Sequence, residues 1–305
     1  MYTFIVNPNA RSGLGAQIWS EIETALQTHT CEYQVLKTKY QCHATKLVRE
    51  LTADGERHTI IVLGGDGTIN EVINGIQHLS KVTLGYIPLG SSNDFARGFA
   101  LASKPEEALT YILNPRRHTY MDVGAIVTGD TKRRFAVSSG IGFDAGVCHQ
   151  VAVSRLKLVL NKLKLGKLSY ALIAIARLVK LTPKNMTISL DGGAPLEYRS
   201  VYFAALMNHQ FEGGGFKFCP DADPGDGLLN LIIVSDMPKL KALLLLPTAF
   251  KGWHVHFKGV HTLTCKSADI ISDIPLPIHT DGEPIIAQSH MAVHLEPKRL
   301  RIITQ

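Results

Sequence analysis

The first 125 residues alternate short apolar runs with segments whose apolar residues recur at helical spacing. The apolar runs predict strands at residues 3–6, 33–36, 59–63 and 83–87, and the segments between and after them predict helices at 15–26, 44–51, 68–77 and 105–113. Strands that alternate with helices are typical of a parallel sheet with helices on both faces. Such sheets bind ligands beyond the carboxyl ends of their strands. The pattern therefore predicts an α/β domain whose site lies in the loops after the strands.

The pattern changes after about residue 124 to short strand-like runs separated by turns rich in glycine and aspartate. These runs (135–138, 186–190, 200–206, 228–234 and 262–265) predict an antiparallel β domain of the sandwich type. Two helical stretches, 155–181 and 239–250, interrupt it. A chain of 305 residues usually forms two domains. We expect them at 1–124 and 125–291, with the strand-like end of the chain (292–305) able to return to the first.

Gly64-Gly65-Asp66-Gly67-Thr68 directly follows the buried strand predicted at 59–63. Glycines let the backbone turn and approach a ligand closely, and the N–H groups at the start of the next helix favour phosphate. Asp66 adds a carboxylate, so the motif indicates phosphate together with Mg²⁺. An ordinary glycine turn between strand and helix is the alternative.

Polar clusters also follow the first and fourth predicted strands, at 7–13 and 88–97. Each is also explained as a turn or a capped helix start. In the second domain, Asp221, Asp223 and Asp226 crowd one loop, which favours a structural Mg²⁺ or Ca²⁺ over a plain acidic turn. Asp281-Gly282-Glu283 is either a hairpin turn or a pair of carboxylates for a metal and a substrate hydroxyl.

Charge and cysteine usage narrow the setting of the protein. The five cysteines form no CxxC pair, and no apolar run reaches the roughly 18 residues of a membrane span, which predicts a cytoplasmic protein in a reducing compartment, able to sit peripherally on the inner face of the membrane. The formal charge is +6, and no acidic residue lies between Asp144 and Asp191. The basic residues of 155–184 suit an anionic membrane surface or a solvated helical face. Aromatic residues make up 7% and do not interleave with this block, which disfavours nucleic acid.

The sequence contains no Walker loop, HExxH, GxSxG or dinucleotide fingerprint. Taken in order, its motifs resemble the diacylglycerol kinase catalytic-domain family, which includes bacterial soluble lipid kinases and is related to sphingosine and ceramide kinases. The resemblance rests on GGDGTINEV at 64–72, PLGSSNDFAR at 88–97, Gly142-Phe143-Asp144-Ala145, the stretch from Asn208 to Leu228, and Asp281-Gly282-Glu283. It implies an NAD-kinase-like nucleotide-binding domain followed by a β-sandwich, with the active site in the interdomain cleft.

The resemblance also implies roles for individual residues. ATP would be held by Asn7, Gly13, Thr38, Gly65, Asp66, Gly67, Thr68, Ile69, Asn70, Glu71 and Ser91, with Asp66 also near the catalytic Mg²⁺. Glu283 would be the general base and Asp281 a metal-linked carboxylate, while Asp223, Asp226 and the carbonyl of Leu228 would hold a structural Mg²⁺. Ser91 stands where the family usually has Thr, and we expect little effect. Cys42 stands where it has Gly; because cysteine does not easily take positive φ, the loop 38–44 is expected to differ, which weakens the assignment of Thr38.

The leading hypothesis is an ATP-dependent kinase that phosphorylates the hydroxyl of a lipid such as diacylglycerol. An NAD kinase would share GGDGT but would not account for NDFAR or the Asp-Gly-Glu turn, and a catalytically silent nucleotide- or lipid-binding regulator would not need Asp66, Asp281 and Glu283. The residues leave open which lipid is the acceptor and whether the protein is a homodimer. The hypothesis requires Asp66 to face Asp281 and Glu283 across the gap between the domains.

Overall fold

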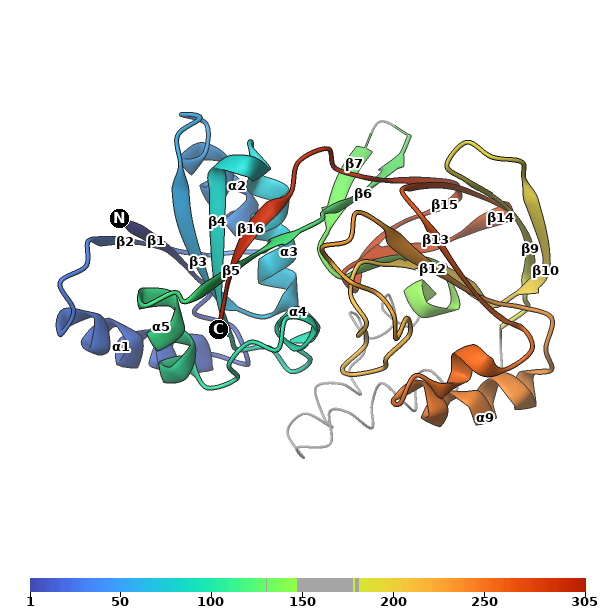
Figure 1. The fold of residues 1–305 in the computed structure, drawn as a ribbon, viewed down its shortest axis with the longest axis horizontal. Helices are drawn as coiled ribbons and strands as arrows, with labels where there is room; N and C mark the ends of the chain where they lie inside the picture. The colour runs from blue at the N-terminus through green and yellow to red at the C-terminus, as the bar shows by residue number, and fades with distance from the viewer. Residues whose placement is uncertain (130, 147–177, 179–180) are drawn as a thin grey trace. The chain divides into compact units, whose positions relative to one another are not determined.

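The computed structural model describes residues 1–129, 131–146, 178 and 181–305 (Figure 1). The chain divides into two compact units. Unit 1 consists of Met1–Val123 and Glu296–Gln305, and unit 2 consists of Gly124–Leu295. The chain thus begins and ends in unit 1 and forms unit 2 as one continuous insertion.

Unit 1 is built on a six-stranded sheet in the order β2-β1-β3-β4-β16-β5. The first four strands in sequence are parallel: β1 (Tyr2–Val6), β2 (Tyr33–Lys37), β3 (His58–Gly64) and β4 (Val82–Pro88). The last strand of the chain, β16 (Leu300–Thr304), pairs in parallel with β4 and antiparallel with the edge strand β5 (Arg117–Met121). The middle of β3 is buried and consists of aliphatic residues only, as expected where helices cover both faces of a sheet.

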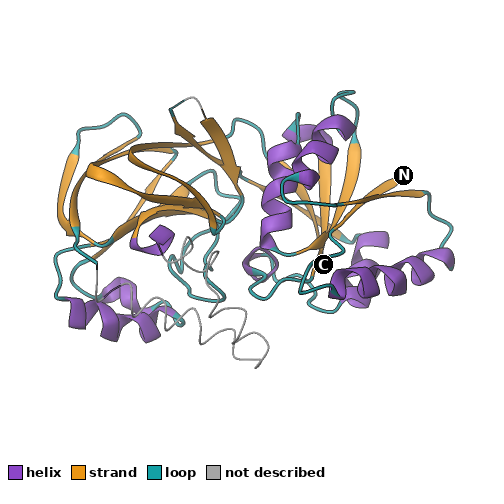
Figure 2. Ribbon diagram, turned by 180° about the vertical axis from the view of Figure 1, so that it is seen from behind, coloured by secondary structure: helices purple, strands orange, loops and turns teal. Residues whose placement is uncertain are grey.

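Helices lie on both faces of this sheet (Figure 2). They are α1 (Leu14–Gln27), α2 (His43–Leu51), α3 (Asp66–Gly75), α4 (Asp94–Gly98) and α5 (Pro105–Leu113), with a short 3₁₀ turn η1 (Leu79–Lys81). In α1 the buried residues Trp19, Ile22 and Leu26 recur at helical spacing and join a core with Phe4 and Ile112. The helices α2 and α3 pack against each other on the other side.

Unit 2 is antiparallel throughout. Its strands are β6 (Gly124–Thr128), β7 (Thr131–Phe135), β8 (Ser138–Gly142), β9 (Lys184–Leu190), β10 (Leu196–Val201), β11 (Phe203–Met207), β12 (Leu229–Val234), β13 (Val260–Cys265), β14 (Ser267–Thr280) and β15 (Glu283–Leu295). The long strand β14 pairs with β9 through its first part and with β8 through its end. Its register with β15 shifts between Ile271 and Ile278, a stretch that contains Pro275 and Pro277, which cannot donate to a ladder. The change of partner along β14 lets the strands enclose one apolar core in a sandwich.

The structure confirms the predicted fold class of a parallel-sheet domain and an antiparallel β-sandwich. In unit 1 the four predicted strands and four predicted helices are present. Two predictions of strands in the second half were wrong. Residues 135–138 span the link between β7 and β8, and residues 200–206 are divided between β10 and β11. Of the strand-like end of the chain, 292–295 belong to β15 in unit 2, and 296–305 lie in unit 1, where 300–304 form β16.

The described part of unit 2 also contains the helix α9 (Lys239–Ala249) and the 3₁₀ turn η2 (Trp253–His256). The helix predicted at 155–181 lies almost wholly outside the described residues. Within the described part of the chain, no helix is long and apolar enough to cross a membrane.

Candidate active site

Four loops of unit 1 meet at the carboxyl ends of β1 to β4, where the sequence predicts ligand binding. Three of them are fixed to a neighbouring strand by a backbone hydrogen bond: Asn7 N–H donates to the Leu63 carbonyl at 2.9 Å, Thr38 N–H to the Val6 carbonyl at 2.8 Å, and Leu89 N–H to the Gly64 carbonyl at 2.7 Å. Because these strands are parallel neighbours, their following loops lie side by side along one edge of the sheet. The edge carries most of the residues predicted to hold ATP.

Gly65 and Gly90 allow two of these loops to touch backbone to backbone. A Cβ added to Gly65 would lie 3.2 Å from the Cα of Gly90, and one added to Gly90 would lie 3.0 Å from the Cα of Gly65. The φ angle of Gly65 is −103°, which any residue adopts. At this position the motif needs glycine for space, because a side chain would push the loops apart.

Asp66 begins α3, and its carboxylate accepts hydrogen bonds from the first residues of another helix, α4. Asp94 N–H donates at 3.2 Å and Phe95 N–H at 3.3 Å. The positive end of the α4 dipole and these amides stabilise the ionised carboxylate. Asp94 is itself buried and forms a 2.6 Å ion pair with Arg97. Asp66 and Asp94, which have 27 residues between them in the sequence, therefore both lie at the start of α4.

The residues after Asp66 turn mostly inward. Asn7 Nδ2 donates to Thr68 Oγ1 at 3.1 Å, and Thr68 and Ile69 donate their N–H groups to the Gly65 carbonyl. The side chains of Thr68, Ile69 and Asn70 are buried, whereas Gly67 is partly exposed at the start of the helix. Of this stretch, backbone atoms and Asp66 are the groups best placed to meet a nucleotide.

Glu71 binds the start of α2. Its Oε1 accepts from Cys42 N–H at 2.9 Å and its Oε2 from Ala44 N–H at 3.1 Å. Cys42 has φ of +65° and ψ of 8°, so the cysteine adopts the left-handed conformation that glycine takes without cost. The expected departure from that conformation at Cys42 was therefore wrong.

The remaining predicted nucleotide residues lie on the same loops. Thr38 is buried directly after β2, while Gly13 and Ser91 are exposed. Gly13 has φ of +99° and follows Arg11 and Ser12, which also have positive φ. Three successive left-handed residues give this loop an irregular path just before α1. Whether each of these residues contacts ATP stays a prediction.

Asp281 in unit 2 ties two turns together. Its carboxylate accepts hydrogen bonds from Ala136 N–H at 2.9 Å, Val137 N–H at 2.8 Å and Ser138 N–H at 3.0 Å, and its own N–H donates to the Ser138 carbonyl at 2.8 Å. The turn between β14 and β15 is thereby fixed to the link between β7 and β8. Glu283 follows two residues later as the first residue of β15, and it is partly buried.

A second polar group lies beside this turn and was missed from the sequence. His279 is fully buried, and its Nε2 lies 3.0 Å from Asp144 Oδ2 and 3.2 Å from Glu212 Oε1. Its Nδ1 accepts from Gly282 N–H at 3.1 Å, inside the Asp-Gly-Glu turn. Asp144 and Glu212 each lie in or beside a motif of the resemblance, but nothing in the spacing of 144, 212 and 279 links the three residues.

The ionisation of His279 is set by opposing effects. Burial by itself would lower its pKa, but the charges of Glu212 and Asp144 and the hydrogen bond to Asp144 outweigh burial and raise the pKa to about 9. The hydrogen bond from the Gly282 amide favours the neutral form of the ring instead, because an Nδ1 that accepts a hydrogen bond carries no proton. Both arrangements keep a proton on Nε2, so the ring faces the carboxylates as a donor. We therefore interpret the group as a hydrogen-bonded acid–base cluster, although its three ligand atoms are close enough together to hold a metal ion.

The acidic loop after Pro220 satisfies some of its acceptors locally. Asp223 Oδ1 accepts from Gly225 N–H at 2.9 Å, and Asp226 Oδ1 accepts from Leu228 N–H at 2.8 Å. Such contacts are typical of aspartate-initiated turns. The structural metal at Asp223, Asp226 and the Leu228 carbonyl stays a prediction.

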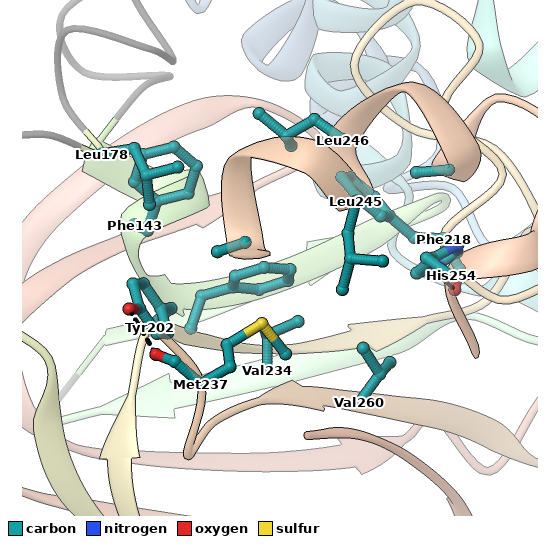
Figure 3. A pocket seen from close by; sticks show the side chains of 13 residues that line it. Phe143, Leu178, Tyr202, Phe218, Val234, Met237, Leu245, Leu246, His254 and Val260 are labelled. Atoms are coloured by element: carbon teal, nitrogen blue, oxygen red, sulfur yellow. Dashed lines mark hydrogen bonds between the residues drawn. The ribbon is translucent and has the colours of Figure 1, made fainter. Parts of the chain in front are cut away.

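An apolar pocket lies between the strands of unit 2 and α9 (Figure 3). Its space is about 460 Å³, including the part open to solvent, and its walls include Phe143, Tyr202, Phe203, Phe218, Met237 and Leu245. Leu245 points from α9 toward Val234 and Val260 on the opposite side (Figure 3). The Tyr202 hydroxyl in the wall donates to the Met237 carbonyl at 2.8 Å.

The pocket and the His279 cluster share one face of the sheet. Ala205 pairs with Gly140, which in turn pairs with His279, and residues paired in this way point to the same side. Phe203, two residues before Ala205 on β11, lines the pocket. A Cβ on Gly140 would lie 1.9 Å from Asp144 Oδ2 and 2.8 Å from His279 Nε2, so the cluster sits directly over this glycine. In unit 2, the apolar pocket and the buried His279 cluster therefore lie on the same face of the sheet.

Solved structures define the class of this architecture. A crystal structure titled as a diacylglycerol kinase from Bacillus anthracis matches with a TM-score of 0.70 at 22% identity, covering 100% of this chain and 96% of that chain. An NAD kinase from Archaeoglobus fulgidus, solved in complex with ATP, matches with a TM-score of 0.57 at 12% identity, covering 100% of this chain and 94% of that chain. At these identities the likeness shows the fold, which is that of the diacylglycerol kinase and NAD kinase structures.

Sequence comparison then gives the family. The diacylglycerol kinase catalytic domain matches residues 1–126, and the YegS C-terminal NAD kinase beta sandwich-like domain matches residues 136–304. "Putative lipid kinase YtlR" of Bacillus subtilis is 30% identical over 99% of this chain and 98% of its own length, and a diacylglycerol kinase of Mycobacterium tuberculosis is 30% identical over 73% of this chain and 70% of its own. The chain belongs to the diacylglycerol kinase catalytic-domain family. It is a lipid kinase, with ATP as the substrate that supplies the phosphate.

Proposed function

We propose that this kinase transfers the γ-phosphate of ATP, bound with Mg²⁺ at the strand-end loops of unit 1, to the hydroxyl of a lipid such as diacylglycerol, with Glu283 as general base. The observation that carries the choice of acceptor is the apolar pocket of unit 2. Its lining is almost entirely hydrocarbon and aromatic, which suits acyl chains and does not suit the polar surface of NAD. The pocket therefore favours a lipid kinase over the NAD kinase alternative.

The nucleotide side of the proposal uses the loops that follow β1 to β4. Asn7, Gly13, Thr38, Gly65 and Ser91 belong to these loops, and their close packing supports a preformed cradle for phosphates. Asp66 is the proposed Mg²⁺ ligand, since a hard cation prefers carboxylate oxygen and the α4 amides fix this one in place. When bound, the cation would neutralise charge on the transferring phosphoryl group.

Glu283 is the proposed base because it follows a rigid turn. The three amides on Asp281 and the contact from Gly282 to His279 fix the backbone just before it. In this scheme Asp281 positions the base, which is a different role from the metal-linked carboxylate that the resemblance implies. Positioning is the larger part of catalysis in phosphoryl transfer, so rigidity here is consistent with the proposed role.

Other parts of the original hypothesis remain proposals. Docking through the basic block 155–184 concerns residues that, apart from 178 and 181–184, lie outside the described part of the chain. A structural Mg²⁺ at the 223–228 loop and a homodimer are proposed on the sequence alone.

The test is transfer of labelled phosphate from ATP in the presence of Mg²⁺, with diacylglycerol in mixed micelles or NAD as the acceptor. We expect label on the lipid and none on NAD. Glu283→Gln should lower turnover by about 10²–10⁴-fold while ATP affinity changes little, because it removes proton transfer and not binding. Glu197→Gln, an exposed change in the same unit, is the matched control and should retain activity.

Two outcomes would contradict the proposal. Label that appears on NAD alone would exclude the lipid acceptor. Full turnover by Glu283→Gln would exclude this residue as the base, even if the lipid were labelled.

A further inference from the structure

The segment 239–258 exposes an unusual amount of apolar surface. It comprises α9 and η2 with their flanking residues, and we name it the α9–η2 surface. Leu240 and Leu244 are each 67% exposed, Trp253 is 56% exposed and Phe250 is 54% exposed; Phe257 is exposed as well. Large apolar side chains grouped in one segment mark a surface that contacts something other than water.

The helix α9 is apolar on two opposite sides. Ala242, Leu245 and Ala249 recur at helical spacing and line the pocket. Leu240 and Leu244, four residues apart on another side, point outward. A helix that is apolar on two opposite sides normally has both sides covered, and here, among the described residues, only the pocket side is covered by the rest of unit 2. With 11 residues, α9 is too short to span a bilayer and suits the interface instead.

The charged residues within this segment are all basic. No acidic residue occurs between Asp236 and Asp269, and the interval contains Lys239, Lys241, Lys251, Lys258 and Lys266. The ammonium of Lys251 lies 4.7 Å from the centre of the Trp253 ring. An aromatic ring beside a basic side chain, next to exposed leucines, is the composition of peptide segments that bind at the boundary of anionic lipid headgroups and acyl chains.

We propose that the α9–η2 surface docks unit 2 on an anionic lipid bilayer. The occupant is a lipid surface because the segment combines exposed apolar side chains with lysines and has no acidic residue, which complements acyl chains below anionic headgroups. The pocket supports the same occupant, since α9 forms its wall on one side and meets the bilayer on the other. The residues of this surface do not overlap in sequence with the basic block at 155–184. Its purpose rests on the proposed function, but the docking itself does not require catalysis.

The chain provides its own reporter for the test. It has two tryptophans, and Trp19 is 2% exposed in the core of unit 1, so Trp19→Phe leaves Trp253 as the single emitter. The Trp19→Phe protein is titrated with vesicles of phosphatidylcholine containing about one third phosphatidylglycerol, and with pure phosphatidylcholine, in the absence of ATP. We expect binding and a blue shift of Trp253 emission with the anionic vesicles, weakened by added salt.

Variants locate the contact. Leu240→Asp with Leu244→Asp should weaken vesicle binding by about tenfold or more, and Lys251→Glu with Lys258→Glu should do so by a similar factor. The controls are Ile286→Asp, which changes an equally exposed apolar residue on β15, and Lys104→Glu in unit 1. Both controls should bind as the parent does. The lysine pair keeps the test decisive if the leucine pair fails to fold.

Several results would overturn the docking. They are absence of binding to anionic vesicles, binding with no change in Trp253 emission, and undiminished binding by both variant pairs. A doubling of mass on light scattering, abolished by the leucine pair, would instead assign the surface to a second copy of the chain. Failure of the kinase proposal is separate: vesicle binding with no labelled lipid contradicts catalysis alone, and label on a soluble short-chain lipid without vesicle binding contradicts docking alone.

Discussion

The two units hold their carboxylates in different ways. In unit 1, Asp66 and Glu71 are partly exposed, and each accepts backbone N–H groups at the start of a neighbouring helix. In unit 2, the side chains of Asp144 and Glu212 are only 9% and 10% exposed, and both contact the single histidine His279. The first arrangement uses fixed backbone dipoles to stabilise negative charge, and the second uses a side chain that can gain or lose a proton.

The difference matters because burial penalises an ionised carboxylate that has no compensating partner. Amides at a helix start do not titrate, so the hydrogen bonds that Asp66 accepts do not depend on the protonation of a partner side chain. The Asp144 and Glu212 pair depends on a proton at His279 instead. Asp281 lies in unit 2 but is held as the carboxylates of unit 1 are, since its partners are three backbone amides.

The largest expected effect on stability follows from Asp281. Asp281→Ala removes the acceptor of three N–H groups, all of which belong to buried residues. We expect the free energy of unfolding of unit 2 to fall by about 3–5 kcal/mol, because buried donors without an acceptor cost about 1–3 kcal/mol each. Urea unfolding followed by far-UV circular dichroism measures it. Asp269→Ala, whose carboxylate contacts the exposed His290, is the control and should cost well under 1 kcal/mol. A loss as small for Asp281→Ala as for the control would show that these amides find other acceptors.

The same contacts explain which parts of the fold the sequence revealed. The four parallel strands of unit 1 and four of its helices were predictable because the strands are apolar runs, each followed by a glycine or polar cluster, whereas the edge strand β5 and the short helix α4 were not predicted. The link between β7 and β8 was not, because it consists of Ala136 and Val137, which resemble strand residues. Its N–H groups are satisfied by Asp281, about 145 positions away, so no local turn residue marks it.

The residues of the candidate site also fall into two groups, those that the sequence pointed to and those that it did not. Motifs identified Asp66, Asp281 and Glu283, because these residues lie within short glycine-containing stretches. The His279 cluster joins three segments that are distant in sequence, and only the pairing of β8 with β14 brings them together. For the α9–η2 surface the sequence predicted only a helix at 239–250, since periodicity alone does not tell which of two apolar sides of a helix is covered.

The pH dependence of stability tests the second arrangement. The pKa of His279 is raised to about 9 in the folded state, against an ordinary value of 6.5. A raised pKa gives stability that is fully present below about pH 6.5 and is lost as the pH rises through 9. We expect the wild-type protein to lose on the order of 3 kcal/mol over this range, and His279→Gln to lose much less. Urea midpoints at several pH values measure the slope.

Two other histidines serve as controls for that slope. His209 is fully buried, and burial lowers its pKa to about 3. Its contribution is therefore constant above pH 6.5 and is lost only as the pH falls below it, so it does not affect the alkaline range. His290→Gln, an exposed change on β15, should leave the alkaline slope unchanged. An equal slope in wild type and His279→Gln would mean that the Gly282 amide keeps the ring neutral throughout.

The smallest effect concerns Cys42 in unit 1. Its N–H group donates to Glu71 while its backbone has φ of +65°, so the contact holds a side-chain-bearing residue in the left-handed region. Cys42→Gly should raise the free energy of unfolding by up to about 1 kcal/mol, because relief of the left-handed strain exceeds the added entropy of the unfolded chain. Cys42→Ala is the matched variant, since it removes the thiol and keeps the Cβ, and we expect almost no change. Equal stabilisation by both variants would assign the effect to the thiol and would show that the Glu71 carboxylate holds this turn without backbone strain.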